Sequence, residues 1–304
     1  MRFGVLILPE DRWEVAREKW RRVEDWGFDH VWTCDHLNWR SFRDREWFSA
    51  IPTLTAAATT TRRITVGVLV ASPNIRHPVG LAKDVATLDD ISAGRFVLGL
   101  GAGAEGFDAR MTRRRPWSRR ERTERFTEFV GLTDRLLTQP VTTFDGRYYH
   151  ARDVHSHPPC RQRPRVPFAI AAAGPQGMRL AARHGRYWVT TGSANRVEPV
   201  SYDRAVPVIH RQLSQLAEAC AATGRDPSTL RRILVAGPTV GGVLASAGAF
   251  HDAAGCYAEA GITDLVVHWP RSAEPFQGRL EVLEQVAADL ALQRSRPTAP
   301  TSSR

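Results

Sequence analysis

The sequence predicts an α/β fold in which helices and parallel strands alternate, and three observations support this prediction. Strand and helix signals alternate along almost the whole chain of 304 residues. Residues 64–70 and 95–100 are near-continuous apolar runs, which are typical of strands buried on both faces. A helical stretch at 78–92 lies between them, and this spacing predicts a β-α-β unit with parallel strands. Eight such strand segments predict a single (β/α)8 TIM barrel.

Each predicted element is bounded by residues that start or stop it. The first helix follows Asp11, which can cap it, carries Trp20 and Val23 on its inner face, and ends at Gly27. The expected strands are residues 3–8, 29–33, 64–70, 95–100, 168–172, 187–191, 232–236 and 264–268. The further expected helices are residues 48–61, 78–92, 118–137, 174–184, 201–222, 246–260 and 281–292.

Two segments fall outside this repeating pattern. VTTFDGRYYHA at 141–151 places Asp145-Gly146 between two strand-like stretches, which predicts a small hairpin inserted beside the barrel. RSRPTAPTSSR at 294–304 has no apolar pattern, so the sequence predicts one barrel domain over 1–293 and a disordered tail. A doubly wound open sheet is the alternative fold, but no GxGxxG motif follows the first strand.

The formal net charge is +10, and eight arginines fall between Arg110 and Arg125. This run is either an anion-binding patch or a solvated helix face, and no nucleic-acid-binding module accompanies it, so we expect no nucleic-acid partner. No apolar run approaches the roughly 20 residues of a membrane span, and no cleavage site follows the apolar start. We therefore expect a cytoplasmic protein without membrane contact. The four cysteines form no CxxC pair, so neither disulfides nor a metal site is expected.

Polar residues directly follow the predicted strands, at the end of a barrel where active sites form. Asp35 and His36 follow the second strand. The carboxylate can accept a hydrogen bond from a ligand, and the imidazole can move a proton near neutral pH. The alternative interpretation is a turn-capping aspartate beside a histidine with ordinary polar partners. Ser72 follows the third strand in a turn that contains Pro73.

Glycines occupy alternate positions at the end of the fourth strand, at Gly99, Gly101 and Gly103. The missing side chains allow close approach of a flat ligand or, equally, tight packing of a neighbouring strand. GPQG at 174–177 precedes a helix, whose free N–H groups can hold a phosphate, although the same residues can form a simple turn. No HExxH, paired-carboxylate or nucleophile-elbow motif occurs, which favours chemistry by a bound cofactor.

Several motifs together resemble the bacterial luciferase-like family, and more closely its branch that uses the deazaflavin coenzyme F420. These motifs are CDHL at 34–37, PTLTAAA at 52–58, VASPNIRHPVGLAK at 70–83, LDDISAGRFVLGLGAG at 88–103, FDGRYY at 144–149 and GPQGMRLAARHGRYWVTTG at 174–192. The resemblance extends from Arg2 to about Arg271, where LVVHWPR is similar to the last barrel strand of the family. It implies a TIM barrel that holds the cofactor ring at the carboxyl ends of the strands.

The resemblance also implies roles for individual residues. Asp35 matches an aspartate that hydrogen-bonds the cofactor ring, and His36 matches a histidine that transfers a proton. Leu69–Val70 falls where many members carry a non-proline cis peptide behind the ring, and Ser72 matches a hydroxyl position near it. The residues that match backbone or phosphate contacts to the cofactor are Ala102, Gly103, Ala173, Gly174, Gln176 and Gly177.

One position departs from the pattern of the sugar-phosphate dehydrogenases in this family. Those enzymes have a catalytic glutamate where this chain has Ala104, and Glu105 comes one residue later. The departure argues against oxidation of glucose 6-phosphate.

The expected function is that of an oxidoreductase that moves a hydride between coenzyme F420 and a small organic or natural-product substrate, alkene reduction being one case. His36 is the expected catalytic residue, loops 38–47 and 104–117 are expected to line the pocket, and a peptide substrate is also compatible. The resemblance implies a homodimer. The alternatives are a monooxygenase of the same fold that uses reduced FMN, and a cofactor-binding barrel without enzymatic activity.

Overall fold

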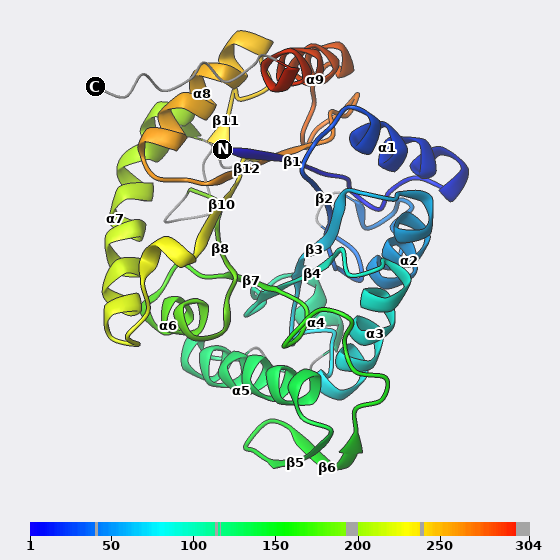
Figure 1. Ribbon diagram of the computed structural model, residues 1–304, viewed down its shortest axis with the longest axis vertical. Helices are drawn as coiled ribbons and strands as arrows, with labels where there is room; N and C mark the ends of the chain where they lie inside the picture. Colours follow the sequence, from blue (N-terminus) through cyan, green and yellow to red (C-terminus); the bar gives the residue numbers. More distant parts are fainter. Residues whose placement is uncertain (40–41, 113–114, 116, 193–199, 238–239, 296–304) are drawn as a thin grey trace.

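The computed structural model describes residues 1–39, 42–112, 115, 117–192, 200–237 and 240–295, and in it eight parallel strands close into a barrel (Figure 1). The order around the ring is β1-β12-β10-β8-β7-β4-β3-β2. These strands are β1 (Arg2–Leu6), β2 (His30–Thr33), β3 (Thr65–Ala71), β4 (Phe96–Gly101), β7 (Phe168–Ala171), β8 (Tyr187–Thr190), β10 (Arg231–Val235) and β12 (Asp264–His268). Pairing of β1 with β12 closes the ring. The predicted TIM barrel is therefore confirmed.

Helices surround the ring of strands (Figure 1). They are α1 (Trp13–Asp25), α2 (Ala50–Thr60), α3 (Pro78–Ile91), α4 (Phe107–Thr112), α5 (Arg119–Thr138), α6 (Pro175–His184), α7 (Tyr202–Ala221), α8 (Ala247–Glu259) and α9 (Leu280–Ser295), with a 3₁₀ turn at Pro227–Thr229. The antiparallel strands β5 (Val141–Asp145) and β6 (His150–His155) form the predicted hairpin, which lies beyond α5 and outside the barrel. The short parallel strands β9 (Val200–Ser201) and β11 (Val240–Gly241) form a further pair.

The ends of two helices show how local sequence sets the element boundaries. Ser118 and Glu121 form a capping box at the start of α5, in which each side chain bonds the other residue's backbone N–H. The expectation that Asp11 caps α1 is wrong. The helix begins after Arg12 without a side-chain cap, because the Asp11 carboxylate instead pairs with Lys19 at 2.6 Å. Gly27 ends this helix as predicted, with a φ of 78° that suits glycine.

The last helix extends further than the sequence predicts. Helix α9 continues through Ser295, so the first two residues of the predicted tail are helical. Arg294 donates hydrogen bonds to the Gly27 carbonyl and, at 2.9 Å, to the Asp29 carboxylate, which anchors this last turn beside the start of β2. Residues 296–304 of the predicted tail lie outside the described residues.

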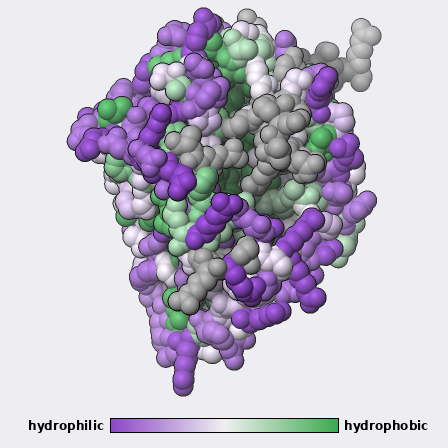
Figure 2. Space-filling view, turned by 180° about the vertical axis from the view of Figure 1, so that it is seen from behind, coloured by the Kyte–Doolittle hydropathy of each residue, from purple (hydrophilic) through white to green (hydrophobic). Residues whose placement is uncertain are grey.

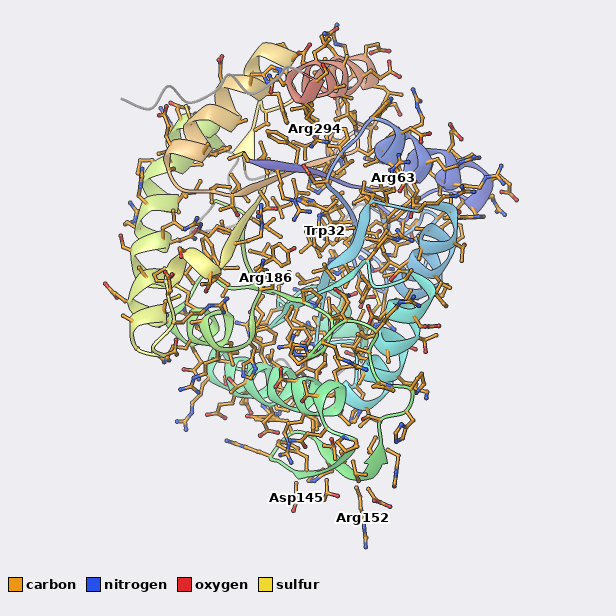
Figure 3. All side chains as sticks on the ribbon, in the orientation of Figure 1. Trp32, Arg63, Asp145, Arg152, Arg186 and Arg294 are labelled. Atoms are coloured by element: carbon orange, nitrogen blue, oxygen red, sulfur yellow. The ribbon has the colours of Figure 1, made fainter. Side chains whose placement is uncertain are left out.

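Two apolar layers hold the barrel together. Side chains such as Trp32, Val97 and Val266 fill the space inside the ring, and Figure 3 marks Trp32 there. A larger layer, including Trp20 and Phe129, packs the helices against the outside of the ring. Burying each such side chain contributes about 1.5–3 kcal/mol relative to exposure. None of the helices in the described part of the chain is both long and apolar enough to cross a bilayer.

A polar network occupies the amino end of the barrel interior. His30 Nε2 lies 3.2 Å from Asp264 Oδ1, and both residues are at most 1% exposed. Trp32 Nε1 donates to His30 Nδ1 at 2.7 Å, and Arg231 donates to the second carboxylate oxygen at 2.9 Å. Burial lowers the pKa of His30. Burial opposes ionisation of Asp264, but hydrogen bonds from His30 and Thr263 outweigh it and lower the pKa of Asp264 to about 2.

Candidate active site

The carboxyl ends of the strands bring most of the predicted polar residues to one end of the barrel. On the face opposite to that of Figure 1, hydrophobic surface lies in a hollow near the centre and hydrophilic side chains surround it (Figure 2). Aromatic rings from two loops pack together at this end. Trp39, which follows β2, stacks on Phe276, which follows β12, with ring centres 5.9 Å apart, and Trp47 lies 6.2 Å from Trp39. These rings form an apolar wall beside the polar residues.

Asp35 lies directly after β2 and is 2% exposed. Its two carboxylate oxygens accept hydrogen bonds from Arg76 Nε at 2.8 Å and Nη2 at 2.7 Å. The hydrogen bond to Asp35 raises the pKa of Arg76 and keeps its guanidinium charged. Each carboxylate oxygen has a second lone pair, so Asp35 remains able to accept a further bond. The sequence analysis did not identify Arg76 as its partner.

His36 forms a second hydrogen-bonded pair with a carboxylate at this end of the barrel. Its Nδ1 lies 2.6 Å from Asp108 Oδ2, and the other oxygen of Asp108 accepts the Leu37 N–H at 2.9 Å. Asp108 belongs to the short helix α4 and is 7% exposed. Trp47 Nε1 donates to the His36 carbonyl at 2.9 Å and so fixes the backbone of this loop. The structure therefore gives the predicted proton-transfer residue a buried acidic partner that the sequence analysis missed.

His268, at the end of β12, is a further residue that the sequence analysis missed. Its Nδ1 donates to the Ala236 carbonyl at 2.9 Å, and its ring stacks on Phe276 with centres 3.5 Å apart. Burial lowers its pKa to about 4, so the ring is neutral at pH 7 and its Nε2 can only accept a hydrogen bond. Alternation along β12 with the interior residues Asp264 and Val266 was the signal that could have placed it inside the barrel.

The Leu69–Val70 peptide bond in β3 is cis, as the resemblance implies. The register between β3 and β4 shifts at this point, between Val68 and Ala71. Ser72 follows and is 6% exposed, and its hydroxyl oxygen accepts the Asn74 N–H at 3.3 Å. Leu69 and Val70 both contact the apolar interior of the barrel. This bulge therefore presents apolar side chains at the carboxyl end of β3.

The alternate glycines of β4 are explained by packing against β3. A Cβ on Gly99 would overlap the Val68 carbonyl oxygen, and a Cβ on Gly101 would lie 2.5 Å from Val70 Cγ2. The structure thus supports strand packing rather than an open ligand surface at these two positions. Gly103 has a φ of 73°, which favours glycine.

Asn74 connects the loops that follow β3 and β4. Its Nδ2 donates to the Ala104 carbonyl at 3.0 Å, and its Oδ1 accepts a bond from Arg125 at 2.9 Å. Arg125 is 5% exposed, so this member of the arginine run is a buried structural residue. Ala102 and Gly103 are half-buried beside this linkage, whereas the Glu105 carboxylate is directed to Arg122 at 3.4 Å. Glu105 is therefore paired at the surface.

Two exposed arginines of the run pair with glutamates of α5. Arg115 pairs with Glu121 at 3.1 Å, and Arg120 pairs with Glu124 at 2.6 Å. Residues 113 and 114 of the run lie outside the described residues. The described part of the run therefore fits a solvated helix face.

The GPQG turn forms the start of helix α6, with Gly174 as its N-cap and Ala173 exposed before it. A Cβ on Gly177 would lie 2.8 Å from Ala172 Cβ, so this glycine permits close packing of the helix start. The Gln176 side chain accepts bonds from Arg179 and borders a depression of about 660 Å³ between α5 and α6. Arg119 and Arg120 line this depression together with Glu124 and Glu128, so both cations and carboxylates lie near the helix N-terminus.

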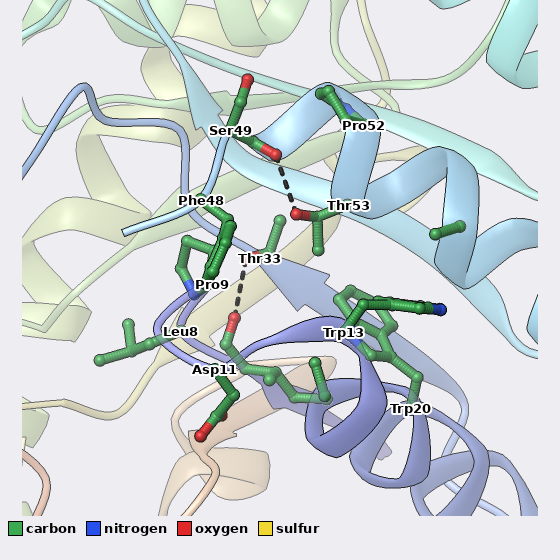
Figure 4. Close-up of a pocket in the computed structure, with 13 residues that line it drawn as sticks. Leu8, Pro9, Asp11, Trp13, Trp20, Thr33, Phe48, Ser49, Pro52 and Thr53 are labelled. Carbon is green, nitrogen blue, oxygen red and sulfur yellow. Dashed lines mark hydrogen bonds between the residues drawn. The ribbon is translucent and has the colours of Figure 1, made fainter. Parts of the chain in front are cut away.

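A separate cavity of about 390 Å³ lies outside the barrel wall, between α1, α2 and the ends of β1 and β2 (Figure 4). Trp13, Trp20 and Phe48 line it with other mainly apolar side chains. None of the predicted site residues lines this cavity, so it is distinct from the candidate active site. Within the described residues, no group of three or more His, Cys, Asp or Glu side chains is arranged to hold a metal ion. Burial raises the pKa of the Cys34 thiol, which disfavours a nucleophilic thiolate.

The fold defines a class of protein, the (β/α)8 barrels, in which active sites form at the carboxyl ends of the strands. A family model described as luciferase-like monooxygenase matches residues 1–242, and the chain belongs to this family. An F420-dependent glucose-6-phosphate dehydrogenase of Beutenbergia cavernae is 38% identical over 179 residues, covering 57% of this chain and 51% of that protein. An F420-dependent hydroxymycolic acid dehydrogenase of Mycobacterium tuberculosis is 31% identical over 211 residues, covering 68% and 54%.

Among solved structures, an F420-dependent secondary alcohol dehydrogenase in complex with an F420-acetone adduct superimposes with a TM-score of 0.77. It covers 94% of this chain and 97% of that one, at 19% sequence identity. This similarity supports the fold alone. The chain spans only about half the length of the curated relatives cited above, so their activities do not transfer to it directly.

Proposed function

We propose that this protein is an oxidoreductase that transfers a hydride between coenzyme F420 and a small organic substrate, with His36 as the group that moves the accompanying proton. The observation that carries the proposal is the His36–Asp108 pair at the carboxyl end of the barrel, where Nδ1 of His36 bonds the aspartate and the ring is one-third exposed. The F420-dependent relatives in the same family support the choice of cofactor.

The described residues fit a cofactor of this kind in two respects. A Cβ on Gly174 would meet nothing nearer than the Arg119 guanidinium at 4.0 Å, so there is space for an anion beside the start of α6. The apolar bulge at Leu69–Val70 suits the face of a flat ring. We propose that the cofactor contacts are those expected from the sequence: Asp35, Leu69, Val70, Ser72, Ala102, Gly103, Ala173, Gly174, Gln176 and Gly177.

A bound deazaflavin accepts or gives one hydride, which carries two electrons and leaves one proton to be moved separately. In the oxidative direction, the Nε2 lone pair of His36 takes the hydroxyl proton of the substrate, and in the reductive direction the same nitrogen returns a proton. Two hydrogen bonds from Arg76 hold Asp35, the residue before His36, in place. The aromatic wall at Trp39 and Phe276 reduces the access of water to this side of the site.

Features of the same region favour one chemical class of substrate. Ala104 lacks the carboxylate of the sugar-phosphate dehydrogenases, and the wall beside His36 is aromatic. These features favour an apolar or aromatic natural-product substrate over a sugar phosphate, and alkene reduction is included in the proposal. The homodimer is an expectation from the resemblance, and light scattering during size-exclusion chromatography tests it. The cytoplasmic location is an expectation from the sequence pattern.

Titration of the purified protein with F420 and with FMN tests the proposal, with binding followed by fluorescence. We expect F420 to bind at micromolar concentration or below, and FMN to bind at least tenfold more weakly. Tight FMN binding without F420 binding would contradict the proposal and favour the second candidate, a monooxygenase that uses reduced FMN, which the description of the family supports. F420 binding without turnover of any alcohol, enone or imine would instead favour a cofactor-binding barrel without enzymatic activity.

A further inference from the structure

We propose that Asp108 is a positioning residue for His36: it fixes the neutral imidazole in the Nδ1–H tautomer, directs Nε2 toward the reaction, and stabilises the imidazolium formed when a proton is taken up. This inference deepens the proposed function and rests on it for the identity of the reaction. It assigns a role to an aspartate that lies four residues after Ala104.

The hydrogen bonds around Asp108 determine which nitrogen of His36 carries the proton. One oxygen of Asp108 accepts the Leu37 N–H at 2.9 Å, and the other lies 2.6 Å from His36 Nδ1. An ionised carboxylate can only accept hydrogen bonds, so Nδ1 must donate. A neutral imidazole has a single N–H, and Nε2 is consequently left with a free lone pair. In water the Nε2–H form of histidine is ordinarily preferred, so Asp108 selects the less common tautomer.

The position of the His36 ring is also restrained by its neighbours. The ring lies 6.3 Å from Trp39 and 6.4 Å from Trp47, measured between ring centres. Trp47 also bonds the His36 carbonyl at 2.9 Å. With Nδ1 held by Asp108, the ring is fixed at one edge and at its backbone, so the direction of Nε2 is defined before a substrate arrives.

The charges around the pair leave Asp108 as the main counter-charge for His36. Asp35 is neutralised by Arg76 at 2.7 Å, and Glu10 is neutralised by Arg271 at 2.6 Å. The Arg43 guanidinium lies 5.2 Å from the centre of the Phe107 ring, and Phe107 directly precedes Asp108. Asp108 itself is 7% exposed, so water and salt screen its charge less than they would screen a surface carboxylate.

Another histidine–aspartate pair in this chain serves as a matched control. His150 Nδ1 lies 2.5 Å from Asp145 Oδ1 on the hairpin, where the two side chains are 71% and 90% exposed. Figure 3 shows Asp145 at the edge of the molecule, outside the barrel. The two pairs share residue types and the bonded ring nitrogen, but only the His36 pair lies at the carboxyl end of the barrel.

The tautomer is measured on the wild-type protein without cofactor, by nitrogen NMR of histidine-labelled protein at high pH, with His36→Gln identifying the resonances. We expect His36 to be protonated at Nδ1. Protonation at Nε2 would overturn the proposal, whether or not the protein proves to bind F420. This measurement needs no variant at position 108, so it remains decisive if such variants fold poorly.

A kinetic experiment compares kcat, KM and the pH profile of three variants of the F420-loaded enzyme. These are Asp108→Asn, Asp108→Glu and the control Asp145→Asn. We expect Asp108→Asn to lower kcat about 10–100-fold with KM changed by less than about threefold, and to move the midpoint of the pH profile of kcat/KM to lower pH by about one unit. Asp108→Glu should restore part of kcat and the pH profile, and Asp145→Asn should match wild type. An Asp108→Asn enzyme with an unchanged pH profile and kcat within twofold of wild type would show that Asp108 has only a structural role.

F420 binding to each variant separates this inference from the proposed function. Asp108→Asn should bind F420 as tightly as wild type, because Asp108 acts through His36 and not on the cofactor. Failure of the wild-type protein to bind F420 would reject the proposed function, and the tautomer of His36 would still decide the role of Asp108.

Discussion

The amino end and the carboxyl end of this barrel each contain a histidine paired with an aspartate, and the two pairs are built differently. At the amino end, His30 uses both ring nitrogens, because Nδ1 accepts from Trp32 and Nε2 bonds Asp264. At the carboxyl end, the contacts among the described residues use only Nδ1 of His36, which bonds Asp108. Residue type alone therefore does not assign a role to a histidine–aspartate pair. A histidine with both nitrogens engaged and no access to solvent stabilises the fold, whereas one with a free nitrogen is available for chemistry.

The surroundings of the two aspartates reinforce this difference. Asp264 is fully buried and receives hydrogen bonds from His30, Arg231 and Thr263. Breaking one member of such a network leaves an uncompensated buried charge, which is costly. The side chain of Asp108 is 10% exposed and that of His36 is 33% exposed, so water can solvate what remains after a substitution there. We therefore expect substitutions at the amino end to affect stability and those at the carboxyl end to affect activity.

The largest effect is expected for Asp264→Ala, which removes the acceptor for His30 and Arg231 inside the barrel. The free energy of unfolding should fall by about 3–5 kcal/mol, measured by urea denaturation, because Arg231 and the His30 N–H lose their partner. Asp145→Ala, on the exposed hairpin, is the control and should change it by less than about 0.5 kcal/mol. A loss below about 1 kcal/mol for Asp264→Ala would remove the contrast between the two ends of the barrel.

The complementary substitution at the carboxyl end is His36→Gln. We expect kcat/KM with F420 and substrate to fall by about 100-fold or more, because the proton has no acceptor at this position. The free energy of unfolding should stay within about 1 kcal/mol of wild type, since the side chain is partly exposed. His150→Gln is the matched control for both measurements. Full activity of His36→Gln would mean that the catalytic group lies elsewhere.

Gly101→Ala tests whether the carboxyl end is as tightly packed as the amino end. The new methyl group would lie 2.5 Å from Val70 Cγ2, so the Val70 side chain or strand β3 must shift. We expect a loss of about 1–3 kcal/mol in unfolding free energy and weaker F420 binding. Gly106→Ala is the control, because a Cβ there meets no atom within 4 Å. Equal effects of the two substitutions would contradict the packing explanation for the glycines of β4.

The last comparison concerns the pH dependence of stability. His268 has a pKa of about 4 in the folded protein and about 6.5 when unfolded, so below pH 6.5 the unfolded chain binds a proton that the folded protein does not. Its contribution is present above pH 6.5 and is lost as the pH falls toward 4, by up to about 1.4 kcal/mol per pH unit. His268→Gln should therefore flatten the decline of unfolding free energy over this range. An unchanged slope would indicate that the ring is protonated in the folded state.

The sequence allowed the barrel to be predicted because its strands are short, buried apolar runs separated by amphipathic helices. The positions of Asp35 and His36 followed from the rule that polar residues after barrel strands meet at one end. Their partners Arg76 and Asp108 lie 41 and 72 residues away in the chain. Arg76 lies in a loop and Asp108 in the short helix α4, so no local pattern connected them to Asp35 and His36. Pairing across such distances depends on the closed ring.

The glycines of β4 illustrate a second limit of prediction from the sequence. Their spacing was visible in the sequence, but whether a ligand or a strand filled the space depended on the register with β3. That register shifts at the cis peptide of Leu69–Val70, which only the family resemblance implied. The cap of α1 was mispredicted for a related reason. The Asp11 carboxylate pairs with Lys19, which lies further along the helix than the backbone N–H groups that a capping residue binds.

Asn74 has a consequence for how this protein can be altered. Its side chain joins the Ala104 carbonyl to Arg125, and its own carbonyl accepts a bond from Thr112 at 3.2 Å. Asn74 thus links three segments into one structural unit: the loop after β3, the loop after β4 and the first turns of α5. Recombination that exchanges the segment after β4 alone would separate these partners, whereas transfer of residues 72–125 as a block would keep them together. Substrate range in this protein is therefore expected to diversify by exchange of whole modules more readily than by exchange of single loops.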